Sequence, residues 1–197
     1  MKLLLKVILL FLLSLGPAVQ AAKPPVIFDS DYGPFIDDVF ALGLLINSGD
    51  LIDLKLIMAT SEQPDLSAKC ISAQLAQSDR NDIDVAVGQS FPAYDKRGSV
   101  CAIAGLMGFA MEPECLAYDG KPPIENGLEY MAQMIIDSDR DDWWYIVVGG
   151  QSTLKALIEQ YPEAAAKIDT LIVMAGNFCG GFEPYPGVQV RLFSFLF

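Results

Sequence analysis

Four aspartates stand within ten residues of the chain: Asp29, Asp31, Asp37 and Asp38. Carboxylates this close repel one another, so the cluster requires exposure to water, raised pKa values or a shared cation. A shared cation accounts for all four side chains. Oxygen ligands suit calcium or magnesium better than a thiophilic metal. The spacing therefore predicts a calcium or magnesium site.

Two other interpretations of the cluster stay open. Solvated acids at a helix N-terminus, where the helix dipole favours negative charge, account for one or two of the aspartates. A phosphoryl-transfer site with Asp29 as nucleophile and Asp31 as acid leaves the second pair unexplained. An EF-hand loop is excluded, because its sixth and twelfth positions counted from Asp29 hold Pro34 and Phe40 instead of glycine and glutamate.

Two apolar segments must position the aspartates. Residues 24–28 have the β-branched and aromatic composition of a buried strand, and residues 38–46 have that of a helix packed on most sides. Between them Gly33 can adopt positive φ, and Pro34 begins a new segment with its φ already set. The first aspartate pair is thus expected at the carboxyl end of a strand, and the second pair at the start of a helix.

The rest of the chain alternates strands and helices. We predict further strands at 54–58, 83–87, 143–148 and 170–174, helices at 66–77, 125–138 and 152–160, and a loop region at 88–123 with a short helix at 102–111. This order predicts an α/β fold, a mostly parallel, Rossmann-like open sheet flanked by helices. Because parallel strands place their carboxyl ends along one edge, Asp29 and Asp31 should lie where sites form in such folds.

Residues 1–21 have the pattern of a secretory signal peptide. Lys2 and Lys6 make a basic start, residues 7–15 are apolar, and residues 19–21 offer small side chains for cleavage. A membrane-anchoring helix is the alternative, but the apolar run ends at Gly16, short of the ~20 residues that span a bilayer. We therefore predict cleavage, no stable membrane span, and a location outside the cell or in the lumen of the secretory pathway.

The charge balance excludes nucleic acid as a partner. The net charge of the whole chain is −12, and it becomes −14 after cleavage because residues 1–21 hold two lysines and no acid. Such a surface repels phosphate backbones. Residues 22–197 are enough for one domain with its own core.

The chain has four cysteines, which the oxidising secretory pathway would allow to form disulfides. Four cysteines allow three complete pairings. Cys101 and Cys115 bracket a segment rich in glycine, alanine and methionine, and we predict that they form a disulfide. Four buried free thiols are the alternative. The chain has no histidine, and its cysteine spacings do not match a zinc site.

The aspartate cluster resembles the opening motif of the inosine/uridine-preferring nucleoside hydrolases, Asp-x-Asp-x-Gly-x-Asp-Asp between a strand and an Ala-Leu-rich helix. In this chain it is written Asp29-Ser-Asp31-Tyr-Gly33-Pro-Phe-Ile-Asp37-Asp38. Two extra residues separate the glycine from the last pair, as in a longer form of the motif in which another aspartate often replaces Phe35.

Two later blocks strengthen the resemblance. Residues 149–157 are similar to the family block Gly-Pro-Leu-Thr-Asn-Ile-Ala, with Ser152 in place of the threonine and Thr153 in place of the asparagine. Without the family, the same segment is a tight strand-to-helix turn with Ser152 as helix N-cap. Residues 174–177 resemble the glycine-rich turn that follows a later strand of the family.

The resemblance implies calcium-dependent hydrolysis of the bond between ribose and base in ribonucleosides. It assigns calcium to the Asp31 and Asp38 carboxylates and the Ser152 carbonyl, with Asp31 also accepting a proton from the attacking water. It assigns ribose to Asp37 and Asn177, and hydrogen bonds around the metal ligands to Asp29. It implies a small-molecule ribonucleoside as partner and leaves the oligomeric state open, although family members often form dimers or tetramers.

The resemblance is incomplete at the carboxyl end. Family members are longer and supply a further calcium-binding aspartate and a histidine that helps the leaving base, whereas this chain has no histidine. We divide the chain into the signal peptide, an incomplete hydrolase-like domain at 22–187 and an atypical apolar tail at 188–197. The tail suggests an incomplete reading of a longer gene, and an edge strand of the sheet is the alternative. Two functions remain, a hydrolase and an inactive relative that binds calcium or ribose.

Overall fold

The computed structural model describes residues 22–32, 36–61, 63–90, 115 and 117–174, together with the backbone of 195–196. The predicted signal peptide, the predicted helix at 102–111, Cys101 and Asn177 lie outside the described residues. Among the described helices, none is long and apolar enough to cross a bilayer.

The described part of the chain forms a six-stranded sheet in the order β3-β2-β1-β4-β5-β6. The first five strands in this order pair in parallel, and β6 pairs antiparallel with β5. The element bounds are β1 Pro25–Ser30, α2 Ile36–Ile46, β2 Asp53–Ala59, α3 Pro64–Gln77, β3 Asp84–Val87, α6 Gly127–Asp137, β4 Trp143–Val147, α7 Ser152–Gln160, α8 Pro162–Ala165, β5 Ile168–Val173 and β6 Phe195–Leu196. The predicted α/β fold with a mostly parallel sheet is confirmed.

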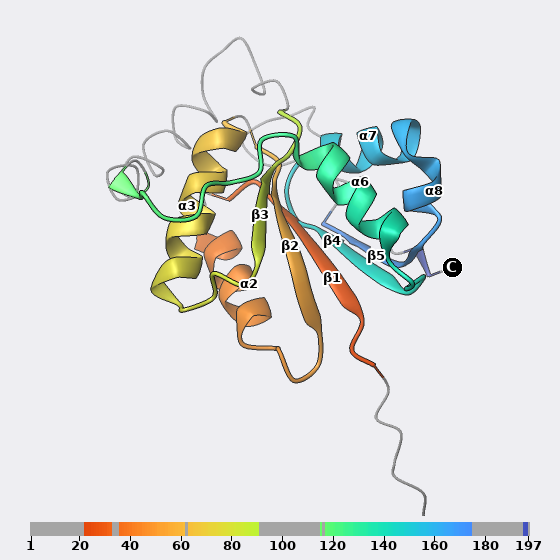
Figure 1. The fold of residues 1–197 in the computed structure, drawn as a ribbon, viewed down its shortest axis with the longest axis horizontal. Coiled ribbons are helices and arrows are strands. Elements are labelled where there is room, and N and C mark those ends of the chain that lie inside the picture. Colours follow the sequence, from red (N-terminus) through yellow and green to blue (C-terminus); the bar gives the residue numbers. More distant parts are fainter. Residues whose placement is uncertain are drawn as a thin grey trace, which may run out of the picture.

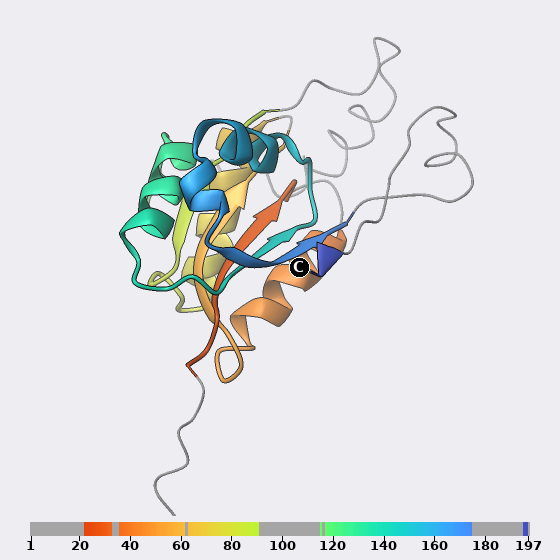
Figure 2. The same cartoon turned by 90° about the vertical axis from the view of Figure 1, so that its right-hand side faces the viewer.

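Helices cover both faces of this sheet. Helices α2 and α3 lie on one side, and α6, α7 and α8 lie on the other (Figures 1 and 2). Strand β1 shows why: Val26 and Phe28 pack in the cluster with α2 and α3, whereas Ile27 packs in the cluster with α6 and α7. A strand that is apolar on both faces requires a helix layer on each, as in other parallel sheets.

The element boundaries differ from the predictions by a few residues. Helix α3 begins at Pro64, two residues before the predicted start, because proline fits the first helical turn and has no N–H to satisfy there. Helix α2 begins at Ile36. The short helix α8 was not predicted. The alternative interpretation of the tail, an edge strand, is confirmed for Phe195–Leu196, whose backbone pairs with β5.

The disulfide prediction is wrong. Cys115 is bonded to Cys70, 45 residues earlier in the chain, so it is not available to Cys101. Cys70 lies in α3, and both bonded cysteines are buried in the cluster between this helix and the sheet. The position of Cys115 against α3 decided the pairing, and neither cysteine spacing nor local composition carries that information.

Candidate active site

The carboxyl ends of the central strands meet at one edge of the sheet, the upper edge in Figure 1. Strand β1 ends with Asp29 and Ser30, both fully buried, between β2 and β4. Backbone hydrogen bonds fasten this end on both sides: Thr60 N donates to Ser30 O at 2.9 Å, and Val148 N donates to Asp29 O at 2.8 Å. The first aspartate pair therefore lies at the edge where the sequence predicted it.

Asp29 is a buried carboxyl group with an incomplete hydrogen-bond shell. The Tyr145 hydroxyl donates to its Oδ2 at 2.7 Å, whereas Oδ1 is buried without a hydrogen-bond partner. Burial raises the pKa of Asp29 to about 7, against the lowering effect of the nearby Thr60 and Tyr145 hydroxyl groups, and the nearby Asp31 carboxylate raises it further. An unpartnered carboxylate oxygen in such a place has a free lone pair for a cation or a proton.

Asp38 faces the same edge from the first turn of α2. Its side chain is buried, and Ser30 Oγ donates to its Oδ1 at 2.6 Å. Burial raises the pKa of Asp38 to about 6, the Ser30 hydrogen bond opposes the rise, and the neighbouring Asp37 carboxylate adds to it. Asp37 itself is exposed. The second aspartate pair is thus divided, one carboxylate turned to the end of β1 and one turned to solvent.

The loop after β4 approaches Asp31 through a glycine. A Cβ atom built on Gly149 would overlap the backbone N of Asp31 and lie 2.8 Å from the carbonyl carbon of Ser30. Only glycine permits this approach. The loop leads directly into α7, so the start of that helix is fixed at the same edge as the aspartates.

Ser152 is the first residue of α7, not its N-cap. The N-cap is Gln151, without a side-chain capping bond, and Ser152 Oγ instead donates to the carbonyl of Gln89 at 3.1 Å. The capping interpretation of Ser152 is therefore wrong. Its neighbour Thr153 is fully buried and hydrogen-bonds to both Thr60 and the backbone of Gln89.

Sequence reasoning missed three hydroxyl groups of this site: Ser30, Thr60 and Tyr145. Tyr145 had a usable signal, because a tyrosine inside a buried strand must find a hydrogen-bond partner for its hydroxyl. Ser30 and Thr60 follow or end strands, as Asp29 and Asp31 do, but nothing local distinguishes them from ordinary loop residues.

The oxygen donors of the site suit calcium in their chemistry. Asp29, Asp31 and Asp38 supply hard carboxylate oxygens, and one of these oxygens, Oδ1 of Asp29, is buried without a partner. Among the described residues, however, no group of three or more aspartate, glutamate, cysteine or histidine side chains lies close enough together to hold a metal ion. A calcium site at this edge therefore needs ligands besides these carboxylates, such as a backbone carbonyl.

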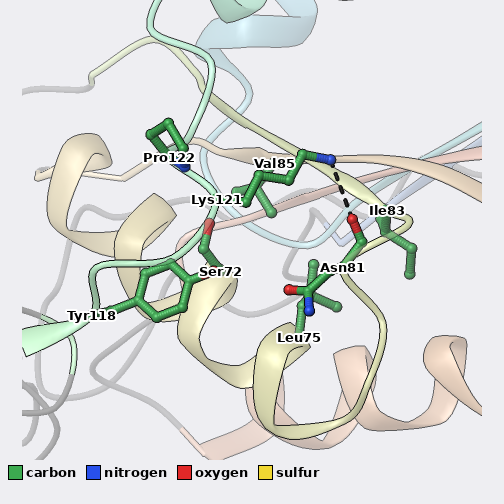
Figure 3. A pocket seen from close by; sticks show the side chains of 8 residues that line it. All are labelled: Ser72, Leu75, Asn81, Ile83, Val85, Tyr118, Lys121 and Pro122. Atoms are coloured by element: carbon green, nitrogen blue, oxygen red, sulfur yellow. Dashed lines mark hydrogen bonds between the residues drawn. The ribbon is translucent and has the colours of Figure 1, made fainter.

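A separate shallow hollow lies beside α3 and the residues that lead into β3. Tyr118, Lys121 and Asn81 are among the side chains around it, and Lys121 Nζ donates to the Asn81 carbonyl at 3.3 Å (Figure 3). The start of β3, not its carboxyl end, borders this hollow. None of the candidate aspartates lines it, so it does not belong to the candidate site.

The fold and the site define a class of protein, an α/β protein with an open, mostly parallel sheet. Its buried acids lie where the central strand ends, next to a glycine-containing turn that leads into a helix. Residues 26–187 match the family described as inosine-uridine preferring nucleoside hydrolase, and the chain belongs to this family.

Three similar proteins give the extent of the match. Over 158 residues the chain is 28% identical to the pyrimidine-specific ribonucleoside hydrolase RihA of Salmonella newport (strain SL254), covering 77% of this chain and 48% of that protein. The purine-preferring ribonucleoside hydrolase from Gardnerella vaginalis has a TM-score of 0.61 at 16% identity, over 85% of this chain and 53% of its own. The inosine-uridine preferring nucleoside hydrolase from Bacillus anthracis has a TM-score of 0.60 at 19% identity, over 82% and 55%. The chain spans about half the length of the curated relatives it matches.

Proposed function

We propose that this protein hydrolyses the N-glycosidic bond of ribonucleosides and uses calcium as its cofactor. The observation that carries the proposal is the burial of two acids at one strand end: Asp29 lies at the carboxyl end of the central strand, and Asp38 accepts a hydrogen bond from Ser30 at that end. Family membership and the ribonucleoside hydrolases among its relatives support the reaction class. These relatives differ in base preference, so the proposal names ribonucleosides in general as the substrate. No feature of the described residues favours the inactive relative.

The proposed mechanism rests on the oxygen atoms of this edge. Cleavage of an N-glycosidic bond passes through a cationic, oxocarbenium-like sugar, which nearby carboxylates stabilise. Asp31 and Asp38, with the Ser152 carbonyl, would hold calcium, which when bound lowers the pKa of water. Asp31 accepts the proton of the attacking water. Asp37, exposed at the start of α2, is free to accept hydrogen bonds from ribose hydroxyls.

Two further assignments complete the proposal. Asn177, outside the described residues, would bind ribose together with Asp37. Asp29, held by Tyr145, orients the metal-binding residues without contacting the substrate.

We further propose that the protein works in the secretory pathway or outside the cell. The Cys70–Cys115 disulfide supports this location, because disulfides persist in oxidising compartments. The signal-like residues 1–21 point the same way.

The proposal is tested by two measurements on the same protein. Release of ribose from inosine and uridine is followed in calcium and in excess chelator, and thermal unfolding is followed under the same conditions. Calcium at about 100 times its Kd should stabilise the folded protein by about 2.7 kcal/mol. Asp31→Asn and Asp38→Asn should abolish both calcium responses, and Asp50→Asn, in the exposed turn after α2, should keep them.

Two results would overturn parts of the proposal. If both site variants keep the wild-type calcium response, the aspartates are not the metal site. If folded wild-type protein binds calcium but releases no ribose, the protein is not a hydrolase.

A further inference from the structure

The outer side of α2 carries a row of exposed apolar side chains, here named the α2 row. Its members, Ile36, Phe40 and Leu44, are 66%, 70% and 69% exposed. Residues four apart lie in line along one side of a helix. Asp38 and Leu42, the buried residues of α2, are each two positions from members of the row and so lie on the opposite side. The α2 row therefore points away from the sheet, on the side opposite to α6, α7 and α8 (Figure 2).

The composition of α2 is that of a helix covered on all sides. A helix with water on one side normally carries polar or charged residues there. After Asp38, however, α2 contains no charged residue, because residues 39–46 read VFALGLLI. Contiguous exposed apolar side chains of this kind mark an interaction surface. Among the described residues, none covers the α2 row.

The disulfide attaches a second apolar segment close to α2. Residues 91–114 lie outside the described residues and end at Cys115, whose Cα atom is 4.6 Å from that of Cys70 in α3. Gln74, one turn further along α3, lies on the same side of that helix as Cys70. Tyr32, in the connection from β1 to α2, donates a hydrogen bond to Gln74 Oε1. Cys115 is therefore attached to the side of α3 that faces the start of α2.

The residues before Cys115 are close enough to reach the α2 row. Arg80, which follows α3, donates to the carbonyl of Ile46 at the end of α2 at 2.9 Å, so the two helices are neighbours along their length. The axes of packed neighbouring helices are about 8–10 Å apart. The four residues from Met111 to Cys115 span up to about 14 Å when extended. A segment that ends at Met111 can therefore lie over α2.

Residues 98–111 match the α2 row in chemistry. They contain no charged side chain, and their large side chains are apolar, among them Ile103, Leu106 and Phe109. Removing such side chains from water is favourable in proportion to the apolar area that is buried. The α2 row offers an apolar surface that is still open to water, so segment and surface would each bury the other.

Two other occupants fit the α2 row less well. A second copy of the chain brings a net charge of −12 to an equally acidic partner, and it adds its own exposed Asp37 and Asp50 to those that flank the row. Residues 175–194, which also lie outside the described residues, include Glu183 and Arg191 and have no uncharged run as long as 98–111.

We propose that residues 98–111 dock on the α2 row of the same chain, and that the Cys70–Cys115 disulfide holds them there. The docked segment shields Ile36, Phe40 and Leu44 from water and holds α2 against the sheet from outside. This docking does not depend on the proposed function, because it concerns the side of α2 that faces away from the candidate site.

A photo-cross-linker at position 40 tests the contact directly. Replacement of Phe40 by p-benzoylphenylalanine in the full, oxidised chain keeps an aromatic ring there and, on irradiation, bonds it to the groups that touch it. After reduction, cleavage following Arg97 and Glu114 releases residues 98–114. The expected product is a bond within one chain between this peptide and the peptide that contains position 40. The same cross-linker in place of Ile158, 52% exposed on α7 at the other face of the sheet, is the matched control and should not bond to 98–114.

Every other cross-linking result would overturn the proposal. A product of twice the mass would show that the α2 row is an interface between copies of the chain. A bond within one chain to residues 175–194 would assign the row to that segment. No product from position 40, or one that forms equally from position 158, would show that the row is open to water.

Urea unfolding provides an independent measurement. Phe40→Ser should lower the unfolding midpoint by about 1 M, as expected for a covered aromatic side chain, whereas Ile158→Ser should change it by less than about 0.3 M. Phe109→Ser should also lower the midpoint. The double variant should lose less than the sum of the two single losses, because either change alone already removes the contact. Additive losses, or a Phe40→Ser midpoint equal to that of wild type, would overturn the docking.

Discussion

Loss of the Cys70–Cys115 disulfide should remove a large part of the stability of this protein. The bond joins residues 45 positions apart. Closing a loop of that length lowers the entropy of the unfolded chain enough to stabilise the fold by about 4 kcal/mol at room temperature. Since single domains are typically stable by only about 5–15 kcal/mol, Cys70→Ser should leave the fold marginal.

Urea unfolding of matched variants measures this loss. Cys70→Ser and Cys115→Ser should each lower the unfolding midpoint by about 2 M, because a domain of this size loses about 2 kcal/mol of stability per molar urea. A reducing agent should bring wild type to the same midpoint and should change neither variant further. Cys101→Ser, which leaves the Cys70–Cys115 bond in place, is the control, and its midpoint should lie above those of both variants.

A stability loss in Cys101→Ser and Cys115→Ser without one in Cys70→Ser would refute this pairing, because Cys101 would then be the partner of Cys115. Peptide mapping decides the same question chemically. Trypsin with a glutamate-specific protease separates Cys101 from Cys115, since Glu112 and Glu114 lie between them. The expected product is the peptide 70–80 linked to a peptide that begins at Cys115.

Two further predictions concern the site and the start of β3. Gly149→Ala should force the loop away from Asp31, cost about 1–3 kcal/mol of unfolding free energy by overpacking, and abolish calcium-dependent stabilisation in thermal unfolding. Asp84 is half-covered, which raises its pKa, but hydrogen bonds from Lys121 and Tyr130 outweigh burial and hold the pKa below 3.8. The ionised form of Asp84 therefore stabilises the fold at pH values above its pKa. The stability advantage of wild type over Asp84→Asn should shrink as the pH falls from about 6 to about 3.

For each of these two predictions, a specific result would contradict the reasoning. Gly43→Ala, inside α2 with open space around it, is the control for Gly149→Ala and should stabilise the helix by up to about 1 kcal/mol. If Gly149→Ala keeps the calcium response, the loop does not constrain Asp31. A stability difference between wild type and Asp84→Asn that is the same at both pH values would show that the ionised form of Asp84 is not what stabilises the fold.

Local patterns predicted most of the elements and part of the site. The apolar run before Asp29 became β1, because burial on both faces demands a uniformly apolar strand. The segment 54–58, apolar except for the exposed Lys55, became β2. The position of Asp29 and Asp31 at the carboxyl end of β1 followed from that assignment. Boundaries were less predictable: α2 begins two residues earlier than its apolar run suggests, since a first turn can include polar and exposed residues.

The sequence by itself determined which segments are strands and helices, which family motifs they carry, and that acids gather where the first strand ends. Tertiary structure alone decided the partners of those acids. Tyr145 lies 116 positions from Asp29, and Thr153 lies 93 positions from Thr60. Such pairs meet only because the sheet order places β1 between β2 and β4 and sets α7 over their ends. The physical reason is that hydrophobic periodicity reports each segment's own burial, whereas hydrogen-bond partners, disulfide pairing and raised pKa values depend on which segments pack together.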